Sequence, residues 1–320
     1  SGIGAPEQAL IKLGIEHKSI FACDVDKYAK QSYLANYKTD KFYDDITKRN
    51  QEEAPYVDLY VGGFPCQAFS MAGKRKGFED TRGTLFFDLL KYLKAKKPKY
   101  FILENVKGLL SHNGGRTFLT ILDCLAKVTN GQYSLTNYED GLNYYIYYKV
   151  LNTKDYGIPQ NRERVFIVGF RDEKHSFKFP KKIPLETKLK DILQNDVNDK
   201  YYLSNKMIKG IEKSNFKERQ PININNVCKT LKIGGDTPCF KVHSLYPRSS
   251  KTGKGGSGPL NKKNGTTYCI DTGNSQAIEY NKKIRRLTPK ECFRLQGFPD
   301  SFVDKCKEEG LSDTQLYKQA

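Results

Sequence analysis

The sequence predicts an α/β protein with an open sheet, joined to a smaller domain of mostly β and irregular structure. Over residues 1–180, short apolar runs typical of strands alternate with helical runs that carry apolar residues on one face. Residues 181–300 are polar and lysine-rich by contrast, and only short elements are expected there. A length of 320 residues also fits about two domains. The final segment, residues 301–320, is expected to return toward the first domain.

The composition favours a polyanionic partner. The chain has 54 lysines and arginines against 36 acidic residues, a formal net charge of +18. Cationic side chains neutralise phosphates and release counterions, although charge alone also fits an ordinary basic protein. No apolar run approaches the ~18 residues of a membrane span, and no secretory signal is recognisable. The eight cysteines include no Cys-x-x-Cys pair, so we expect neither zinc nor disulfides, and a cytoplasmic location.

The expected elements follow from apolar periodicity. Strands are expected at residues 19–23, 57–61, 100–103, 144–151 and 165–170. Helices are expected at residues 7–13, 27–36, 85–96 and 117–128. Polar or reactive side chains follow several of these strands. Because open α/β sheets bind ligands at the carboxyl ends of their strands, we expect a functional site at that edge.

Cys66 is the strongest candidate for a reactive residue. It lies shortly after a predicted strand, within the sequence Gly-Gly-Phe-Pro-Cys-Gln. Gly62 and Gly63 are expected to let the backbone turn and a flat ligand approach, while Pro65 holds Phe64 extended. A lone cysteine at a strand end is more often a buried structural residue. No packing demand calls for this surrounding sequence, however, so we expect a nucleophile.

Residues 63–70, Gly-Phe-Pro-Cys-Gln-Ala-Phe-Ser, resemble the catalytic motif of the cytosine-5 DNA methyltransferases. Further resemblances follow in the order of that family: Glu-Asn-Val at residues 104–106, Gln-Asn-Arg-Glu-Arg at residues 160–164, and Arg-Arg-Leu-Thr-Pro-Lys-Glu at residues 285–291. In the last of these, Thr288 is expected to cap a helix whose first position is Pro289, and a mainly structural role is expected. The resemblance implies a Rossmann-like sheet that uses S-adenosylmethionine, a separate target-recognition domain, and a restriction-modification enzyme of bacterial or phage type.

The resemblance implies S-adenosylmethionine as the cofactor and assigns its contacts by position. The turn containing Gly2 and Gly4 resembles the back half of the family's Phe-x-Gly-x-Gly turn. Glycine turns that open a helix can bind polar groups through free amides. Asp24 ends a predicted strand, where a carboxylate can accept hydrogen bonds from ribose hydroxyls. Asp26 is expected to cap the following helix instead.

The adenine end of the cofactor is assigned to a second segment. Asp45 and Ile46 resemble the family's Gly-Asp-Ile segment, in which the aspartate meets the adenine amino group and the isoleucine packs on the ring. A solvated loop acid is the alternative for Asp45. Pro65 and Leu85 complete the expected cofactor contacts.

The resemblance also implies a mechanism. The Cys66 thiolate would attack carbon 6 of cytosine and make carbon 5 nucleophilic. Glu104 would supply a proton or strong hydrogen bond at ring nitrogen 3. Arg164 would hold the ring carbonyl oxygen, and Arg162 would orient Glu104 or favour the thiolate. A stacked base cannot present carbon 6, so the target must be flipped out, and no metal is needed.

Double-stranded DNA is the expected partner. The run Lys-Arg-Lys at residues 74–76 lies between two glycines and favours a lid that closes on phosphates, although a solvated surface is the alternative. Residues 181–280 are expected to read the target sequence. The expected DNA contacts are Phe64, Gln67, Ser70, Lys74, Arg75, Lys76, Thr230 and Lys254.

The resemblance leaves the ends of the fold open. A strand directly before Ser1 and a final helix beyond Ala320 are expected from the family. We therefore expect a longer protein, monomeric at full length, or a second polypeptide that supplies both pieces. A tRNA cytosine-5 methyltransferase of similar fold and an inactive DNA-binding fragment are the alternative functions.

Overall fold

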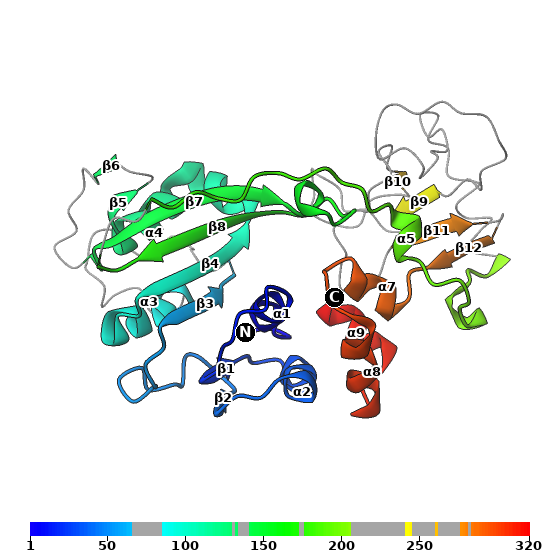
Figure 1. The fold of residues 1–320 in the computed structure, drawn as a ribbon, viewed down its shortest axis with the longest axis horizontal. Helices are drawn as coiled ribbons and strands as arrows, with labels where there is room; N and C mark the ends of the chain where they lie inside the picture. Colours follow the sequence, from blue (N-terminus) through cyan, green and yellow to red (C-terminus); the bar gives the residue numbers. More distant parts are fainter. Residues whose placement is uncertain are drawn as a thin grey trace. The chain divides into compact units, whose positions relative to one another are not determined.

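The computed structural model of the protein describes residues 1–65, 85–129, 132–133, 141–172, 176–205, 241–244, 260–261, 276–280 and 283–320. The chain forms two compact units (Figure 1). The first unit comprises Ser1–Leu151 and Glu163–Lys181, and the second comprises Asn152–Arg162 and Lys182–Ala320. The division at Lys181 separates the alternating part of the sequence from the polar part, while the recognition role of the second unit stays a prediction.

The first unit contains a six-stranded mixed sheet with the order β3-β4-β8-β7-β5-β6. These strands are β3 (Leu59–Gly63), β4 (Tyr100–Val106), β5 (Ala126–Thr129), β6 (Gln132–Tyr133), β7 (Tyr144–Asn152) and β8 (Glu163–Phe170). β3 runs parallel to β4, whereas β8 runs antiparallel to β4. The predicted α/β class is confirmed, and the strands that carry or precede the predicted catalytic residues, β3, β4 and β8, lie next to one another in the order β3-β4-β8.

Two amphipathic helices cover the apolar side chains of this sheet. α3 (Leu85–Lys96) buries Phe86, Leu89 and Leu93, and α4 (Arg116–Leu125) buries Phe118 and Ile121, all in one core with β4 and β8. A 3-10 segment, η3 (Lys107–Gly115), leads into α4. The predicted helix at residues 117–128 was too long. Residues 126–128 of that run belong to β5, which pairs with β7 instead of continuing the helix.

A second, two-stranded parallel sheet completes the first unit. β1 (Phe21–Cys23) pairs with β2 (Lys41–Tyr43), and both lie with α1 (Ala5–Lys12) and α2 (Lys27–Asn36) in the blue part of Figure 1. Asp26 caps α2 by accepting hydrogen bonds from the amides of Tyr28 and Ala29, as predicted. The ring of Phe21 lies 5.4 Å from that of Tyr92 on α3, so aromatic packing joins this sheet to α3. The strand expected before Ser1 stays a prediction.

The second unit carries an antiparallel sheet of short strands and several short helices. Its sheet has the order β10-β9-β11-β12, from β9 (Lys241–Ser244), β10 (Leu260–Asn261), β11 (Gln276–Tyr280) and β12 (Lys283–Arg286). Its helices are η4 (Thr153–Tyr156), α5 (Leu189–Ile192), η5 (Asp199–Tyr201), α7 (Pro289–Arg294), α8 (Asp300–Glu308) and α9 (Asp313–Gln319). Leu189, Ile278, Leu287, Cys292 and Leu295 form its core. α9 packs there through the Tyr317 hydroxyl, which donates to the Leu287 carbonyl at 2.8 Å.

A buried ion pair organises the turn between β12 and α7. Glu291 is fully buried and Arg285 is 5% exposed. The Glu291 carboxylate accepts hydrogen bonds from both terminal nitrogens of Arg285 and from the amides of Thr288 and Gln194. Thr288 caps α7 with Pro289 in the first turn, as predicted. The segment therefore has the structural role that the sequence indicated.

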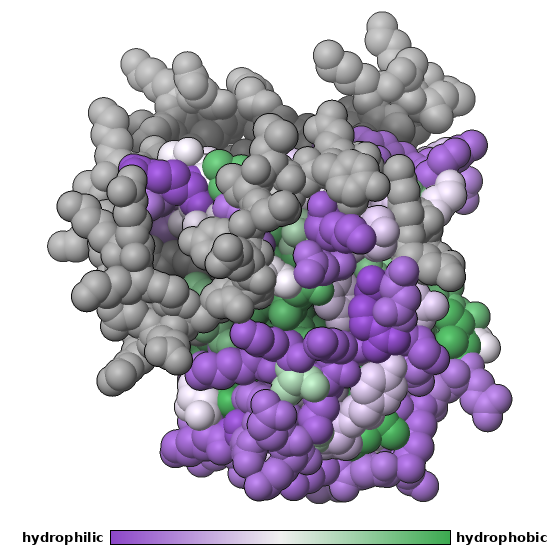
Figure 2. Space-filling view, turned by 90° about the vertical axis from the view of Figure 1, so that its left-hand side faces the viewer, coloured by the Kyte–Doolittle hydropathy of each residue, from purple (hydrophilic) through white to green (hydrophobic). Residues whose placement is uncertain are grey.

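The described surface is mainly polar. Most described residues on the face drawn in Figure 2 are hydrophilic, with small apolar areas between them. Across the described parts of the chain, no helix is both long and apolar enough to cross a lipid bilayer.

Candidate active site

Glu104 and Arg164 form the centre of the site. Glu104 lies on β4 opposite Phe166 of β8, two positions from the pair Val106 and Arg164. Side chains in such diagonal positions lie on one face, within reach of a long residue. Arg164 Nε accordingly lies 2.9 Å from Glu104 Oε1, with 18% of the arginine and 36% of the glutamate side chain exposed. The antiparallel register thus brings together two residues that lie sixty positions apart in sequence.

The end of β3 lies directly beside this pair. Gly63 is the register partner of Glu104, and a β-carbon added to Gly63 would lie 3.6 Å from Glu104 Oε2. The chain after it is anchored, because Asn105 Nδ2 donates to the Phe64 carbonyl at 2.6 Å. Asn105 is 3% exposed and Phe64 is 6% exposed. The backbone two residues before Cys66 is therefore fixed against the strand that carries Glu104.

Gly62 has a role other than the turn predicted from the sequence. It lies within β3, and neither it nor Gly63 has a positive φ. A β-carbon on Gly62 would lie 2.9 Å from Leu89 Cδ1. The glycine therefore permits close packing of β3 against α3. The predicted turn was wrong for both glycines, since both are extended within β3. A glycine in a strand can instead allow a neighbouring element to approach the backbone closely.

Several predicted site residues lie outside the described residues, and their roles stay predictions. They are the expected nucleophile and the expected DNA contacts Cys66, Gln67, Ser70, Lys74, Arg75, Lys76, Thr230 and Lys254.

Arg162 belongs to the second unit, at the end of its segment Asn152–Arg162. Hydrogen bonds across the segment hold its two ends: the Thr153 amide donates to the Arg162 carbonyl at 3.2 Å, and Thr153 Oγ1 donates to the Gln160 carbonyl at 2.6 Å. Arg162 itself precedes β8 and is not part of that strand. Its predicted role beside Glu104 stays a prediction.

Gly2, Gly4 and Asp24 come together at the carboxyl end of β1. The Gly2 amide donates to Asp24 Oδ2 at 2.8 Å, and the Asp26 amide donates to Asp24 Oδ1 at 3.0 Å. Gly2 has φ of +58° and Gly4 has φ of +88°, a region that favours glycine. A β-carbon on Gly4 would lie 2.3 Å from the Tyr37 ring, whereas one on Gly2 would have no atom within 4 Å. Space for a ligand therefore adjoins Gly2 and the Asp24 carboxylate.

Asp45 and Ile46 follow the neighbouring strand β2, so they lie at the same sheet edge as Asp24. Asp45 Oδ1 accepts hydrogen bonds from the Thr47 hydroxyl at 2.7 Å and the Thr47 amide at 2.9 Å. These bonds, led by the hydroxyl, hold the pKa of Asp45 below its usual value. Asp45 Oδ2 lies 3.9 Å from Lys48 and has room to accept another donor. Ile46 packs against the main core of the unit.

The two remaining predicted cofactor contacts flank the undescribed part of the active-site loop. Pro65 is exposed directly after the buried Phe64, and Leu85 is the half-buried first residue of α3. Neither residue has a polar side chain, so each could supply only apolar contact to a ligand.

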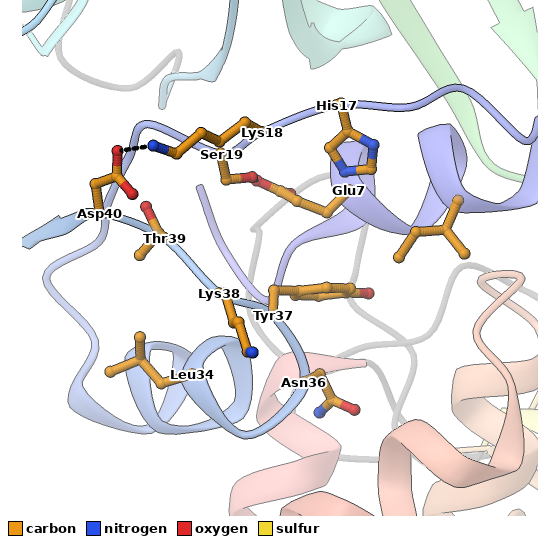
Figure 3. A pocket seen from close by; sticks show the side chains of 11 residues that line it. Glu7, His17, Lys18, Ser19, Leu34, Asn36, Tyr37, Lys38, Thr39 and Asp40 are labelled. Atoms are coloured by element: carbon orange, nitrogen blue, oxygen red, sulfur yellow. Dashed lines mark hydrogen bonds and ion pairs between the residues drawn. The ribbon is translucent and has the colours of Figure 1, made fainter.

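The described residues also surround a hollow of about 810 Å³ at the opposite edge of β1 and β2 (Figure 3). Ser19 lies just before β1 and Asp40 just before β2, whereas Asp24 and Asp45 follow these strands. Two of its lining residues, Lys18 and Asp40, form an ion pair at 2.8 Å. The hollow is lined by Glu7, Ile11, His17, Lys18, Ser19, Leu34, Asn36, Tyr37, Lys38, Thr39 and Asp40. It is therefore separate from the predicted cofactor site.

Comparison with known proteins decides the family. Residues 1–320 match the C-5 cytosine-specific DNA methylases. The chain belongs to this family. It is 38% identical over 306 residues to the type II methyltransferase M1.ScrFI of Lactococcus lactis subsp. cremoris, covering 94% of this chain and 67% of that protein. It is 37% identical over 324 residues to M.NlaX of Neisseria lactamica, covering 100% of this chain and 88% of that protein.

Solved structures confirm the fold of this methylase. The Dnmt2 methyltransferase of S. pombe superposes with a TM-score of 0.64 at 17% identity, over 100% of this chain and 90% of that one. An Entamoeba histolytica methyltransferase, EhMeth, gives a TM-score of 0.61 at 20% identity, over 100% of this chain and 90% of that one. The chain is therefore a DNA cytosine-5 methyltransferase with a Rossmann-like sheet, and S-adenosylmethionine is its methyl donor.

The residues at the carboxyl ends of β1 and β2 fit this donor. Asp24 and Asp45 offer carboxylate oxygens for hydroxyl and amino groups, and the space beside Gly2 would be filled by any side chain. Sequence reasoning missed Asn105, although it adjoins Glu104 in the same motif. A polar residue placed next to a catalytic candidate at a strand end was the available signal.

Proposed function

We propose that this methylase transfers a methyl group to carbon 5 of a flipped-out cytosine in a specific double-stranded DNA site, through a covalent adduct at Cys66. The observation that carries the proposal is the Glu104–Arg164 pair beside the end of β3. Gly63 is the register partner of Glu104, and Cys66 follows Gly63 by only three residues in the sequence. The fixed carbonyl of Phe64 further limits where the intervening backbone can run.

The proposed chemistry assigns a separate task to each side chain. The Cys66 thiolate attacks carbon 6 of the cytosine and forms a carbon–sulfur bond, which moves electron density to carbon 5. Glu104 gives a proton or strong hydrogen bond to ring nitrogen 3, and Arg164 donates to the ring carbonyl oxygen. Carbon 5 gains the methyl group as its bond to the sulfonium sulfur breaks, and a base then removes the proton from carbon 5. The ring double bond re-forms as the carbon–sulfur bond to Cys66 breaks and the thiolate leaves, and nitrogen 3 returns its proton to Glu104.

The cofactor is proposed to bind across the carboxyl ends of β1 and β2. Asp24 would accept from the ribose hydroxyls, and Asp45 would accept from the adenine amino group through its open oxygen Oδ2. Ile46, Pro65 and Leu85 would pack against the bound molecule, with the Gly2 and Gly4 turn below it. When bound, S-adenosylmethionine supplies an electrophilic methyl group on a sulfonium.

The covalent step is tested by trapping. Duplex DNA with 5-fluorocytosine at the target position should form a denaturation-resistant complex in the presence of S-adenosylmethionine, because fluorine cannot leave as a proton. Peptide mapping should locate the adduct at Cys66. An adduct on another residue, or none from a protein that methylates normal DNA, contradicts the mechanism. A protein that binds this DNA without methylating it would be an inactive DNA-binding fragment.

We propose that residues 181–280 select the DNA sequence while the first unit carries the chemistry. The lysine-rich composition of this interval supports the assignment. Exchanging it with the matching interval of a related methylase should exchange the methylation sites, as read by bisulfite sequencing. An active hybrid that keeps the recipient's site refutes the assignment.

A restriction-modification origin is proposed from the relatives, several of which are named type II methyltransferases. Such an enzyme modifies every copy of its site, so DNA from cells that express it should be protected from an endonuclease of that site. Scattered, incomplete methylation would contradict this. We further propose that the full-length protein acts as a monomer, which sedimentation of the protein with and without DNA can test.

A further inference from the structure

Arg49 is a buried cation held by aromatic rings in the first unit. It is 6% exposed, and no acidic side chain of the described residues forms an ion pair with it. Its guanidinium carbon lies 5.0 Å from the ring centre of Phe21, 5.0 Å from that of Tyr92 and 5.5 Å from that of Tyr43. The rings come from β1, α3 and β2, so Arg49 lies where the small sheet packs against α3. Cation–π attraction partly compensates the loss of water.

Packing alone does not explain a charged residue at this place. Both terminal nitrogens of Arg49 are buried without a hydrogen-bond partner among the described residues. Unpaired buried donors destabilise a protein, and apolar residues of similar volume often replace buried charges without loss of stability. An apolar side chain such as methionine would fill the same space between the rings. Burial raises the pKa of the Tyr60 hydroxyl, and the nearby Arg49 guanidinium opposes that rise. The hydrogen bond that Arg49 itself donates within the described residues is made by Nε.

That hydrogen bond leads to the segment that follows β2. Arg49 Nε donates to Gln51 Oε1 at 2.8 Å, and Gln51 Nε2 donates to the Ile46 carbonyl at 3.0 Å. Gln51 is 9% exposed, so both bonds are shielded from water. Ile46 directly follows Asp45, whose Oδ1 accepts from Thr47 and whose Oδ2 lies 3.9 Å from Lys48 Nζ and accepts no hydrogen bond from the described residues. The buried cation is thus connected by two hydrogen bonds to the backbone next to this carboxylate.

We propose that Arg49 is a positioning residue for the adenine end of the cofactor site. Through Gln51 it fixes the Ile46 carbonyl, and with it the direction in which Asp45 presents its open oxygen. This inference rests on the proposed binding of adenine at Asp45. It assigns to Arg49 the selectivity for the adenine amino group and leaves the chemistry of methyl transfer to Glu104 and its neighbours.

The test measures discrimination between S-adenosylhomocysteine and S-inosylhomocysteine by calorimetry on the purified protein. The second compound carries a carbonyl where adenine has its amino group, so it lacks the donor that Asp45 is proposed to bind at that position. The unmodified protein should prefer the adenosyl compound by about tenfold or more, consistent with one lost hydrogen bond to a charged acceptor. Arg49→Met should reduce this preference at least threefold without lowering the melting temperature.

Two further variants complete the experiment. Gln51→Leu breaks the same connection and should reduce the preference equally, and the Arg49→Met/Gln51→Leu double variant should add little to either change. Tyr92→Phe is the matched control, because it keeps the ring beside Arg49 but removes the hydroxyl that donates to the Pro55 carbonyl at 2.7 Å. It should lower the melting temperature and keep the preference.

The outcomes separate the two proposals. Full discrimination in Arg49→Met or Gln51→Leu, or additive losses in the double variant, overturns the positioning role while the proposed cofactor site stands. An unmodified protein that binds both compounds equally overturns the adenine contact of Asp45 and the role of Arg49 together. Binding of neither compound contradicts the proposed cofactor site itself.

Discussion

The two units each contain an arginine–glutamate pair, and the two pairs differ mainly in burial. In the second unit, Arg285 and Glu291 lie 2.7 Å apart with 6% and 0% of their side chains exposed. In the first unit, Arg164 and Glu104 lie 2.9 Å apart with 18% and 36% exposed. The Arg285–Glu291 pair of the second unit is enclosed by protein, whereas the Arg164–Glu104 pair of the first unit opens to solvent beside the end of β3.

The difference lies in what each carboxylate can still accept. Glu291 already accepts from Arg285, Thr288 and Gln194 on its two oxygens, so no further partner can enter without breaking a bond. Glu104 keeps part of its surface open, and Arg164 is its ion-pair partner among the described residues. An exposed pair contributes little to stability, about 0–1 kcal/mol, but can exchange its partner for a substrate. A saturated buried pair holds a fold and can bind nothing else.

The largest expected effect is on catalysis at the open pair. Glu104→Gln should lower the single-turnover rate of methyl transfer about 10²–10⁴-fold, because the amide cannot give a proton to ring nitrogen 3. Its free energy of unfolding should change by less than about 1 kcal/mol. Rapid-quench kinetics with labelled S-adenosylmethionine and urea unfolding provide the two readings. A variant of normal rate would remove Glu104 from the chemistry.

The buried pair should respond in the opposite way. Glu291→Gln leaves Arg285 buried without its counter-charge and should lower the free energy of unfolding by about 3–5 kcal/mol. Glu308→Gln makes the same chemical change at an exposed position of α8 and should have almost no effect. Urea unfolding of both variants checks this. If the two lose equal stability, burial does not explain the contribution of the pair.

The sequence predicted the structural role of the segment that contains Arg285 and Glu291. It did not predict that Glu104 and Arg164 are in contact. Thr288, Pro289 and Glu291 form a local capping signal, which four consecutive residues can encode. The contact between Glu104 and Arg164 depends on the register of two strands distant in sequence, and that register is set by tertiary pairing. The family resemblance named both residues, but only the fold shows that they touch.

The first unit contains other features that no sequence pattern could reveal. The connection from Arg49 through Gln51 to Ile46 joins neighbours in sequence, yet the aromatic rings around Arg49 come from three separate elements. The close packing of Gly62 on Leu89 likewise depends on where α3 lies. Helix α2 and its Asp26 cap were predicted correctly because capping and apolar periodicity act within a few residues.

A smaller effect is expected where the first unit anchors the chain before Cys66. Asn105→Ala leaves the buried Phe64 carbonyl without its donor and should lower the free energy of unfolding by about 1–3 kcal/mol. Asn105→Asp should lower the free energy of unfolding more than Asn105→Ala does, because a carboxylate oxygen would then face the Phe64 carbonyl oxygen. Thermal unfolding of the two variants tests the order. Equal stability of Asn105→Asp and the unmodified protein would contradict the anchoring role.

The cap of α7 should contribute less again. Thr288→Ala removes the side chain that accepts from the Glu291 amide and should lower the free energy of unfolding by about 1 kcal/mol. Thr288→Ser keeps the hydroxyl and should restore most of the loss. Chemical unfolding of both variants is the measurement. Equal free energies of unfolding for Thr288→Ala and Thr288→Ser would mean that the Thr288 hydroxyl does not stabilise the start of α7.

The smallest effect concerns acid stability in the second unit. Hydrogen bonds from Arg294 hold the pKa of Asp300 below its usual value. Because the pKa of Asp300 is lower in the folded than in the unfolded protein, its charged form stabilises the fold at pH values above the unfolded pKa of about 3.9. This contribution to the free energy of unfolding is lost as the pH falls through the pKa of the folded state. Since Asp300 is 38% exposed, solvent limits the contribution to less than about 1 kcal/mol. Asp300→Asn should reduce this acid-dependent loss in unfolding curves measured from pH 6 down to about pH 3.

The different roles of the exposed Glu104–Arg164 pair and the buried Glu291–Arg285 pair are tested most directly by the rate of covalent trapping on 5-fluorocytosine DNA. The same time course is measured for the unmodified protein, Glu104→Gln and Glu291→Gln, each normalised to its folded fraction. Glu104→Gln should trap at least about a hundredfold more slowly, while folded Glu291→Gln should trap at the normal rate. Normal trapping by Glu104→Gln, or equal slowing in both variants, would contradict the division between an open pair that acts on the substrate and a buried pair that holds the fold.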